Sequence, residues 1–149
     1  LIDSPRKLDA LIEEPSRDSS KLIETFWPGP LTILFKPKST IPENITTGLL
    51  GLRQPGNAIT RKLLSALDHP LTAPSANFSG KNPATTAKQV ELQLGNKLDL
   101  ILDAGVCKGG QPSTLVDATQ KPIRLIREGA VSFKCIQESL RTLPTQESL

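Results

Sequence analysis

Two arginines close short apolar runs of this sequence, and a loop rich in Ser and Asn follows a third such run. The arginines are Arg53 and Arg127, and the loop 74–80 carries Ser75 and Asn77. Arginine binds a carboxylate or a phosphate through two parallel hydrogen bonds. In open α/β sheets, ligands gather at the carboxyl ends of the strands. These residues together predict a pocket for an anionic substrate.

Each of these features also has a less specific interpretation, which the residues alone leave open. An arginine at the end of a strand can be an exposed terminus and nothing more. The loop 74–80 is rich in turn-forming residues, which is typical of a solvated turn. Asp99, Asp103 and Asp117 flank predicted strands. Carboxylates at such positions more often cap turns than bind metal ions.

Other catalytic chemistries are excluded by the residues that the chain lacks. Its only histidine, His69, lies in a predicted turn, and Ser75 has no GxSxG motif around it. A Ser–His–Asp nucleophile is therefore excluded, and His69 is interpreted as a surface residue. The two cysteines, Cys107 and Cys135, form no CxxC pair. We expect no zinc site and two reduced thiols in a cytoplasmic protein.

The segment 105–114 has the general form of a phosphate-binding loop, because it is rich in glycine and follows a strong predicted strand. However, Gln111 stands where that motif requires lysine, and Pro112 has no backbone N–H to offer a phosphate. A P-loop is therefore excluded. We expect instead a flexible loop that presents Ser113 and Thr114.

The composition is that of one globular domain. The chain has 149 residues, of which 37% are hydrophobic and 22% charged, with a net charge of +3. This mild positive charge permits anionic ligands without requiring them. The apolar stretches are much shorter than the roughly 20 residues that cross a bilayer. We expect a single domain over residues 1–149, with a flexible tail at 142–149.

Helices and strands alternate along the sequence without a repeat, which predicts an α/β domain. Capping residues, prolines and apolar periodicity predict helices over residues 5–14, 18–26, 57–67, 86–94 and 132–140. Short apolar runs predict strands over residues 31–35, 49–53, 70–73, 98–102, 114–117 and 123–127.

An ordered set of motifs resembles the YrdC/Sua5 family of L-threonylcarbamoyladenylate synthases. The motifs keep the family's order over roughly residues 20–132, and they are Phe26–Thr32, Gly51–Pro55, Ala73–Gly80, Pro83–Ala87, Asp99–Gly105, Pro112–Asp117 and Ile126–Ala130. The resemblance implies an α/β fold with a twisted, open, mixed sheet flanked by helices, of the YrdC/RibB-like type. It also implies a concave and largely positive face.

The activity that this resemblance implies is the joining of L-threonine, bicarbonate and ATP. The products would be threonylcarbamoyl-AMP and pyrophosphate, with Mg²⁺ assisting and no tightly bound cofactor. The adenylate would then supply the t6A modification of tRNA, with tRNA or t6A-transfer proteins as downstream partners. Such chemistry needs binding and orientation rather than a protein nucleophile. The alternative is a non-catalytic member that binds RNA or a nucleotide.

The resemblance also implies roles for particular residues. For L-threonine, these are Arg53 on the carboxylate, the backbone of Ala73, and Ser113 on the amino acid or its carbamate. For ATP, they are Ser75 and Asn77 at the phosphates, with Arg127, Leu49 and Pro83 close to the nucleotide.

Two departures from the family pattern qualify these expectations. The family's opening third carries a Lys-x-Arg motif that is expected to neutralise ATP, and the given sequence has no counterpart of it. The sequence contains no Met and begins with Leu1. We therefore expect it to lack the N-terminal segment of the family's domain and, by itself, to be inactive. In addition, Pro112 replaces the Glu that usually precedes Ser-Thr.

Overall fold

A computed structural model describes residues 1–46, 48–78, 80–107 and 110–141. The chain divides into two compact units, of which unit 1 comprises Leu1–Leu71 with Pro112–Leu149, and unit 2 comprises Thr72–Gln111. The expectation of one domain stays a prediction, and the expected tail lies outside the described residues. Within the described ranges, no helix is both long and apolar enough to cross a membrane.

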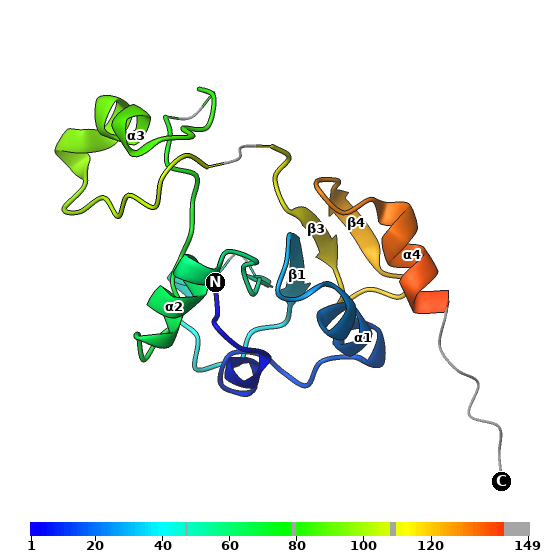
Figure 1. Cartoon of the computed structure of the whole chain (residues 1–149). Helices are drawn as coiled ribbons and strands as arrows, with labels where there is room; N and C mark the ends of the chain where they lie inside the picture. Colours follow the sequence, from blue (N-terminus) through cyan, green and yellow to red (C-terminus); the bar gives the residue numbers. More distant parts are fainter. Residues whose placement is uncertain (47, 79, 108–109, 142–149) are drawn as a thin grey trace, which may run out of the picture. The chain divides into compact units, whose positions relative to one another are not determined.

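Unit 1 is built on a four-stranded sheet whose strand order is β2-β1-β3-β4. The strands are β1 (Leu31–Phe35), β2 (Leu50–Leu52), β3 (Thr114–Asp117) and β4 (Arg124–Arg127). The central pair, β1 and β3, is parallel, whereas β1–β2 and β3–β4 are antiparallel. Figure 1 shows β1, β3 and β4 in succession. This mixed, open sheet confirms the predicted α/β fold class.

Most helices begin at capping residues that were recognisable in the sequence. The side chains of Ser16, Asn57 and Thr86 each accept a hydrogen bond from the backbone N–H three residues later, which satisfies a donor that the first turn would leave free. The helices and 3₁₀ turns are η1 (Pro5–Ala10), α1 (Arg17–Phe26), η2 (Glu43–Ile45), α2 (Ala58–Ser65), α3 (Ala87–Leu94), η3 (Gly95–Lys97) and α4 (Phe133–Arg141).

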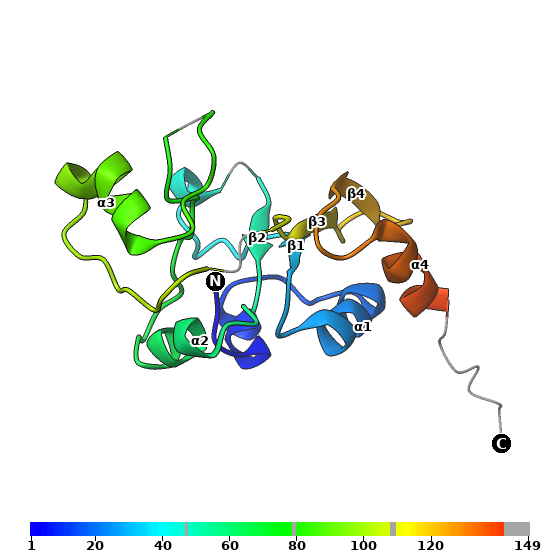
Figure 2. The same cartoon turned by 45° about the horizontal axis from the view of Figure 1, so that its top comes forward.

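The hydrophobic core of unit 1 lies on one face of the sheet. Leu31, Ile33 and Phe35 alternate with less buried residues along β1, so every second side chain of this strand points into the core. Leu22 of α1 and Ile136 of α4 are fully buried in the same cluster. Figures 1 and 2 show α1 and α4 side by side. These two helices therefore supply the apolar layer on that face.

Three predicted elements differ from the structure. Residues 98–102 form no strand, and Leu100 and Leu102 are 73% and 64% exposed. Their alternation is that of a strand, but a strand forms only when a neighbouring strand pairs with its backbone.

The other two differences also have local causes. Residues 70–73 are irregular, because Pro70 and the following Pro74 have no N–H for a strand ladder. The first predicted helix is the short 3₁₀ turn η1, because the chain leaves it to pair Ile12 with Pro37.

Candidate binding site on the open face of the sheet

Strand register places several polar residues on the sheet face opposite the apolar core. Thr32 of β1 pairs with Leu115 of β3, and Leu115 pairs with Arg127 of β4. Paired residues of neighbouring strands share a face, so these three lie in one row across the sheet. Ser113 precedes Leu115 by two residues and falls on the same face. We call this face the open face.

The predicted residues of β2 extend the same row. The antiparallel register joins Ile33 to Leu52 and Leu34 to Gly51. If this register is continued by one residue beyond the Ile33–Leu52 pair, Arg53 falls opposite Thr32. Leu49, two residues before Gly51, falls on the same face. Four sequence-predicted residues therefore share the open face, namely Leu49, Arg53, Ser113 and Arg127.

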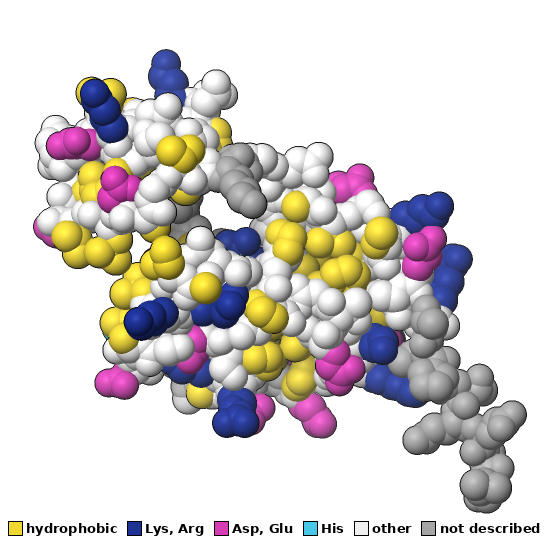
Figure 3. Space-filling model, in the orientation of Figure 1, with side chains coloured by type: hydrophobic (Ala, Val, Ile, Leu, Met, Phe, Trp, Pro, Cys, Tyr) yellow, Lys and Arg dark blue, Asp and Glu magenta, His cyan; other side chains and the backbone are white. Residues whose placement is uncertain are grey.

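The two arginines of the open face lie at opposite ends of the row. Neighbouring strands lie about 4.8 Å apart, so the backbones of Arg53 and Arg127 are separated by three spacings, or about 14 Å. In the space-filling view, hydrophobic side chains gather over the region of β1, β3 and β4 (Figure 3). On the open face, the strand register places Thr32 and Leu115 between the two arginines.

Ser113 is the best-connected of the predicted residues. The guanidinium Nη2 of Arg127 donates to the Ser113 carbonyl at 2.9 Å and lies 3.4 Å from its hydroxyl oxygen. The Ser113 hydroxyl is also 2.8 Å from the Thr32 hydroxyl on the neighbouring strand. The structure thus brings Ser113 and Arg127 together and adds Thr32, which the sequence reasoning did not single out. The sequence did contain a signal for Thr32, because this residue is the last one of the motif Phe26–Thr32.

The backbone around Ser113 is fixed, even though Pro112 replaces the usual Glu. The Pro112 carbonyl accepts a hydrogen bond from the Ala130 N–H at 2.9 Å. The fully buried Thr114 hydroxyl accepts from the Gly129 and Val131 N–H groups at 2.9 and 3.1 Å and donates to the Val131 carbonyl. The motif residues after Ser113 therefore secure its position.

Replacing Thr114 with valine tests this anchor. Valine has the same shape but no hydroxyl, so two backbone N–H groups and one carbonyl lose their partner. We expect the free energy of unfolding to fall by about 2 kcal/mol, measured by urea denaturation. The matched control is Thr25→Val, because the exposed Thr25 hydroxyl, as far as the described residues show, bonds only to a carbonyl of its own helix. Equal losses for the two variants would contradict the role of Thr114.

Arg53 is half-buried and has a lowered pKa because burial disfavours its charged form. Across the described parts of the chain, its guanidinium makes no hydrogen bond or ion pair. Its backbone is fixed, since the Arg53 carbonyl accepts from the Ile2 N–H at 3.1 Å, and the next carbonyl, of Gln54, accepts from Gly29 at 2.9 Å. A half-buried cation without a partner favours the binding of an anion.

The motif Phe26–Thr32 acts as a support for Arg53 and for β1. The Trp27 indole N–H donates to the Leu31 carbonyl at 2.7 Å inside the core. A side chain at Gly29 would place its Cβ 2.3 Å from the Phe26 carbonyl oxygen, so only glycine fits there. The specificity of this motif therefore reflects the tight turn that joins α1 to the sheet.

The remaining predicted residues belong to unit 2. Ala73, Ser75 and Pro83 are exposed there. Asn77 is partly buried, and its amide nitrogen donates to the Phe78 and Lys81 carbonyls, each at 2.9 Å. Its amide oxygen is buried and has no partner within the described ranges. The amide nitrogen thus shapes the loop, and the predicted contacts with ATP stay predictions.

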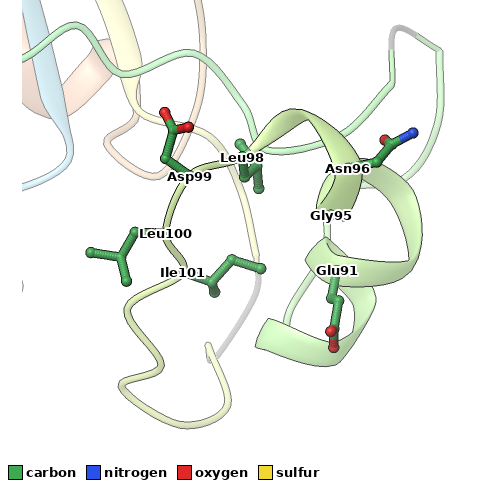
Figure 4. Close-up of a pocket in the computed structure, with 7 residues that line it drawn as sticks. All are labelled: Glu91, Gly95, Asn96, Leu98, Asp99, Leu100 and Ile101. Atoms are coloured by element: carbon green, nitrogen blue, oxygen red, sulfur yellow. The ribbon is translucent and has the colours of Figure 1, made fainter.

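Unit 2 also has a hollow of its own, next to α3 (Figure 4). It is lined by Glu91, Gly95, Asn96, Leu98, Asp99, Leu100 and Ile101. None of the predicted ligand-binding residues lies in this lining.

Several simpler expectations about polar residues are confirmed. His69 is exposed, and Cys107 and Cys135 are free thiols on the surface. Asp103 and Asp117 cap local turns, accepting from the N–H groups two residues later at 2.8 and 2.9 Å. The expectation of no zinc site stays a prediction, and over the described ranges no group of three or more His, Cys, Asp and Glu side chains could hold a metal ion.

Comparison with known proteins identifies what this arrangement resembles. The model of the Sua5/YciO/YrdC family, described as telomere recombination, matches residues 1–129. A threonylcarbamoyl-AMP synthase of Pyrococcus abyssi is 35% identical, over 92% of this chain and 41% of its own length. A putative threonylcarbamoyl-AMP synthase of Methanocaldococcus jannaschii is 39% identical, over 78% of this chain and 55% of its own length. The chain thus spans roughly half of the length of these relatives.

Solved structures agree with the sequence relatives. The crystal structure of P. abyssi Sua5 complexed with L-threonine superimposes with a TM-score of 0.87 at 34% identity, covering 93% of this chain and 41% of that one. The structure of E. coli YciO gives a TM-score of 0.78 at 24% identity, covering 88% of this chain and 65% of that one. The second likeness supports the fold.

Proposed function

Because the chain belongs to the Sua5/YciO/YrdC family, we propose that it takes part in the synthesis of threonylcarbamoyl-AMP from L-threonine, bicarbonate and ATP. The product would serve the t6A modification of tRNA. The observation that carries this proposal is the half-buried guanidinium of Arg53 on the open face, which has no partner among the described residues. The L-threonine complex of the P. abyssi relative supports an amino-acid carboxylate as its anion.

In this proposal the open face binds both ends of the product. Arg53, next to β2, pairs with the threonine carboxylate, and Ser113, next to β3 on the far side of β1, holds the amino acid or its carbamate. Arg127, about 14 Å from Arg53 along the row, faces the nucleotide. Fixing the two reactants on one rigid sheet lowers the entropic cost of bringing them together.

The chemistry requires no nucleophile from the protein. The threonine amine bonds to the carbon of bicarbonate with loss of water, and the carbamate oxygen then attacks the α-phosphorus of ATP and displaces pyrophosphate. Negative charge develops on the phosphates, which Arg127 would offset. Ser75 and Asn77 of unit 2 remain proposed phosphate contacts, and Ala73 and Pro83 remain proposed contacts with threonine and ATP.

Mg²⁺ would reach the site together with ATP. The described residues include no cluster of three or more acidic, His or Cys side chains for a metal. Mg²⁺ commonly keeps several waters and binds mainly through substrate phosphates. Bound in this way, it would supply charge neutralisation at the phosphates.

A direct assay tests the proposed function. The protein at its full natural length is incubated with ATP, bicarbonate, Mg²⁺ and labelled L-threonine, and we expect release of pyrophosphate together with a labelled adenylate. Omitting bicarbonate is the control and should abolish both products. Tight tRNA binding without either product would overturn the proposal in favour of a non-catalytic RNA-binding member.

A further inference from the structure

Thr32 is in direct contact with a proposed substrate-binding residue but has no assigned role. Its hydroxyl lies 2.8 Å from that of Ser113, across the parallel pair β1–β3. It is only partly buried and stands in the row between Arg53 and Arg127. Among the residues that the structure describes, Ser113 is the only side chain with which the Thr32 hydroxyl forms a hydrogen bond.

The hydrogen-bonding capacity of Ser113 defines what Thr32 can do. A serine hydroxyl has one proton to donate and two lone pairs to accept with. The Arg127 guanidinium can only donate, and its Nη2 approaches the Ser113 oxygen at 3.4 Å. If Thr32 also donates, both lone pairs of Ser113 face protein donors. Its own proton is then left for a ligand, and the ligand atom must be an acceptor.

We propose that Thr32 is a positioning residue, whose hydroxyl donates to Ser113 and so directs the Ser113 proton towards the carboxylate of the bound amino acid. The carboxylate is the ligand group because the backbone position of Arg53 falls opposite Thr32 in the same row. An anion held by Arg53 would thus lie beside the Thr32–Ser113 pair. This inference rests on the proposed function.

The test uses two variants of Thr32 in the full-length protein. Thr32→Val keeps the shape and the strand preference but removes the hydroxyl, and Thr32→Ser restores a hydroxyl. We expect Thr32→Val to raise the KM for L-threonine by about threefold to tenfold, the worth of one hydrogen bond. The KM for ATP and kcat should change less than twofold, and Thr32→Ser should remain close to wild type. Thr25→Val, in α1, is the matched control.

Two further measurements show whether Thr32 acts through Ser113 and on a carboxylate. In a Ser113→Ala background, Thr32→Val should have no additional effect on the KM for L-threonine. Binding of 1-amino-2-propanol, which is threonine without its carboxylate and so lacks the acceptor, should be equally weak in wild type and Thr32→Val. Additive effects in the double variant, or equal losses for both ligands, would overturn the inference.

The outcomes separate this inference from the proposed function. If wild type neither binds L-threonine nor makes the adenylate, the proposed function fails, and the role of Thr32 fails with it. If wild type is active and Thr32→Val keeps the wild-type KM for L-threonine, only the role of Thr32 is overturned. A thermal melting curve for each variant shows whether a loss of binding reflects unfolding. If Thr32→Val does not fold, the deciding comparison is between the KM values for L-threonine of Thr32→Ser and Ser113→Ala. A Thr32→Ser protein with the KM of Ser113→Ala would then contradict the inference.

Discussion

Replacing Arg53 with alanine is expected to raise the KM for L-threonine about 30-fold, while the KM for ATP changes less than twofold. The loss corresponds to about 2 kcal/mol, typical of removing one partner of a partly desolvated charge pair. We expect a loss of this size because Arg53 is half-buried and its guanidinium has no protein partner among the described residues. The measurement is steady-state pyrophosphate release with each substrate varied in turn.

Two further variants give this prediction its controls. Arg53→Lys keeps the charge but loses the planar, two-pronged geometry, so its KM for L-threonine should lie between those of wild type and Arg53→Ala. Arg17→Ala removes an exposed arginine of α1, on the covered side of the sheet, and should behave as wild type. If Arg53→Ala raises the KM for both substrates equally, Arg53 does not bind the threonine carboxylate.

Gly129→Ala is expected to destabilise the protein by about 3 kcal/mol or more and to displace Ser113. A Cβ at this position would lie 2.1 Å from the Pro112 carbonyl oxygen and 2.7 Å from the carbonyl carbon of Ser113. Both neighbours are backbone atoms, so the strain cannot be relieved by a change of rotamer. Urea denaturation gives the free energy of unfolding, and the KM for L-threonine reports on Ser113 in the remaining folded protein.

The matched control for stability is Gly51→Ala, in β2 of the same sheet. A Cβ at Gly51 would make ordinary contacts, at 3.4 Å to Leu34 and 3.6 Å to Thr32. We expect its free energy of unfolding to change by less than about 1 kcal/mol. Similar losses for Gly129→Ala and Gly51→Ala would show that the close approach at Gly129 does not hold the serine segment.

Much of the fold was predictable because local signals determined it. The strand Leu31–Phe35 was predicted with the observed bounds, since prolines flank an apolar run. The caps Asn57 and Thr86 have the residue types that begin helices. The strand predicted at 98–102 was wrong, because alternation of apolar residues describes only a preference, and pairing with a neighbour decides whether a strand forms.

The candidate site was predictable only in part, for a physical reason. The chemistry of arginine follows from its residue type, so Arg53 and Arg127 could be named from the sequence, and the family resemblance added a role for Ser113. Thr32 could not, because a threonine in a strand is ordinary. Its importance comes from the register between β1 and β3, which joins residues far apart in the sequence. The motif Phe26–Thr32 contains this residue, but no local pattern shows that it contacts Ser113.

The pairing of β1 with β3 has a consequence for how binding activity is acquired during folding. Thr32 and Ser113 are separated by 81 positions, and closing a loop of that length costs about 4 kcal/mol of chain entropy. The pocket therefore cannot assemble before the β3 segment has been synthesised and has docked beside β1. Contacts of such large sequence separation form slowly. Recovery of L-threonine binding during refolding should consequently follow the slowest phase of sheet formation.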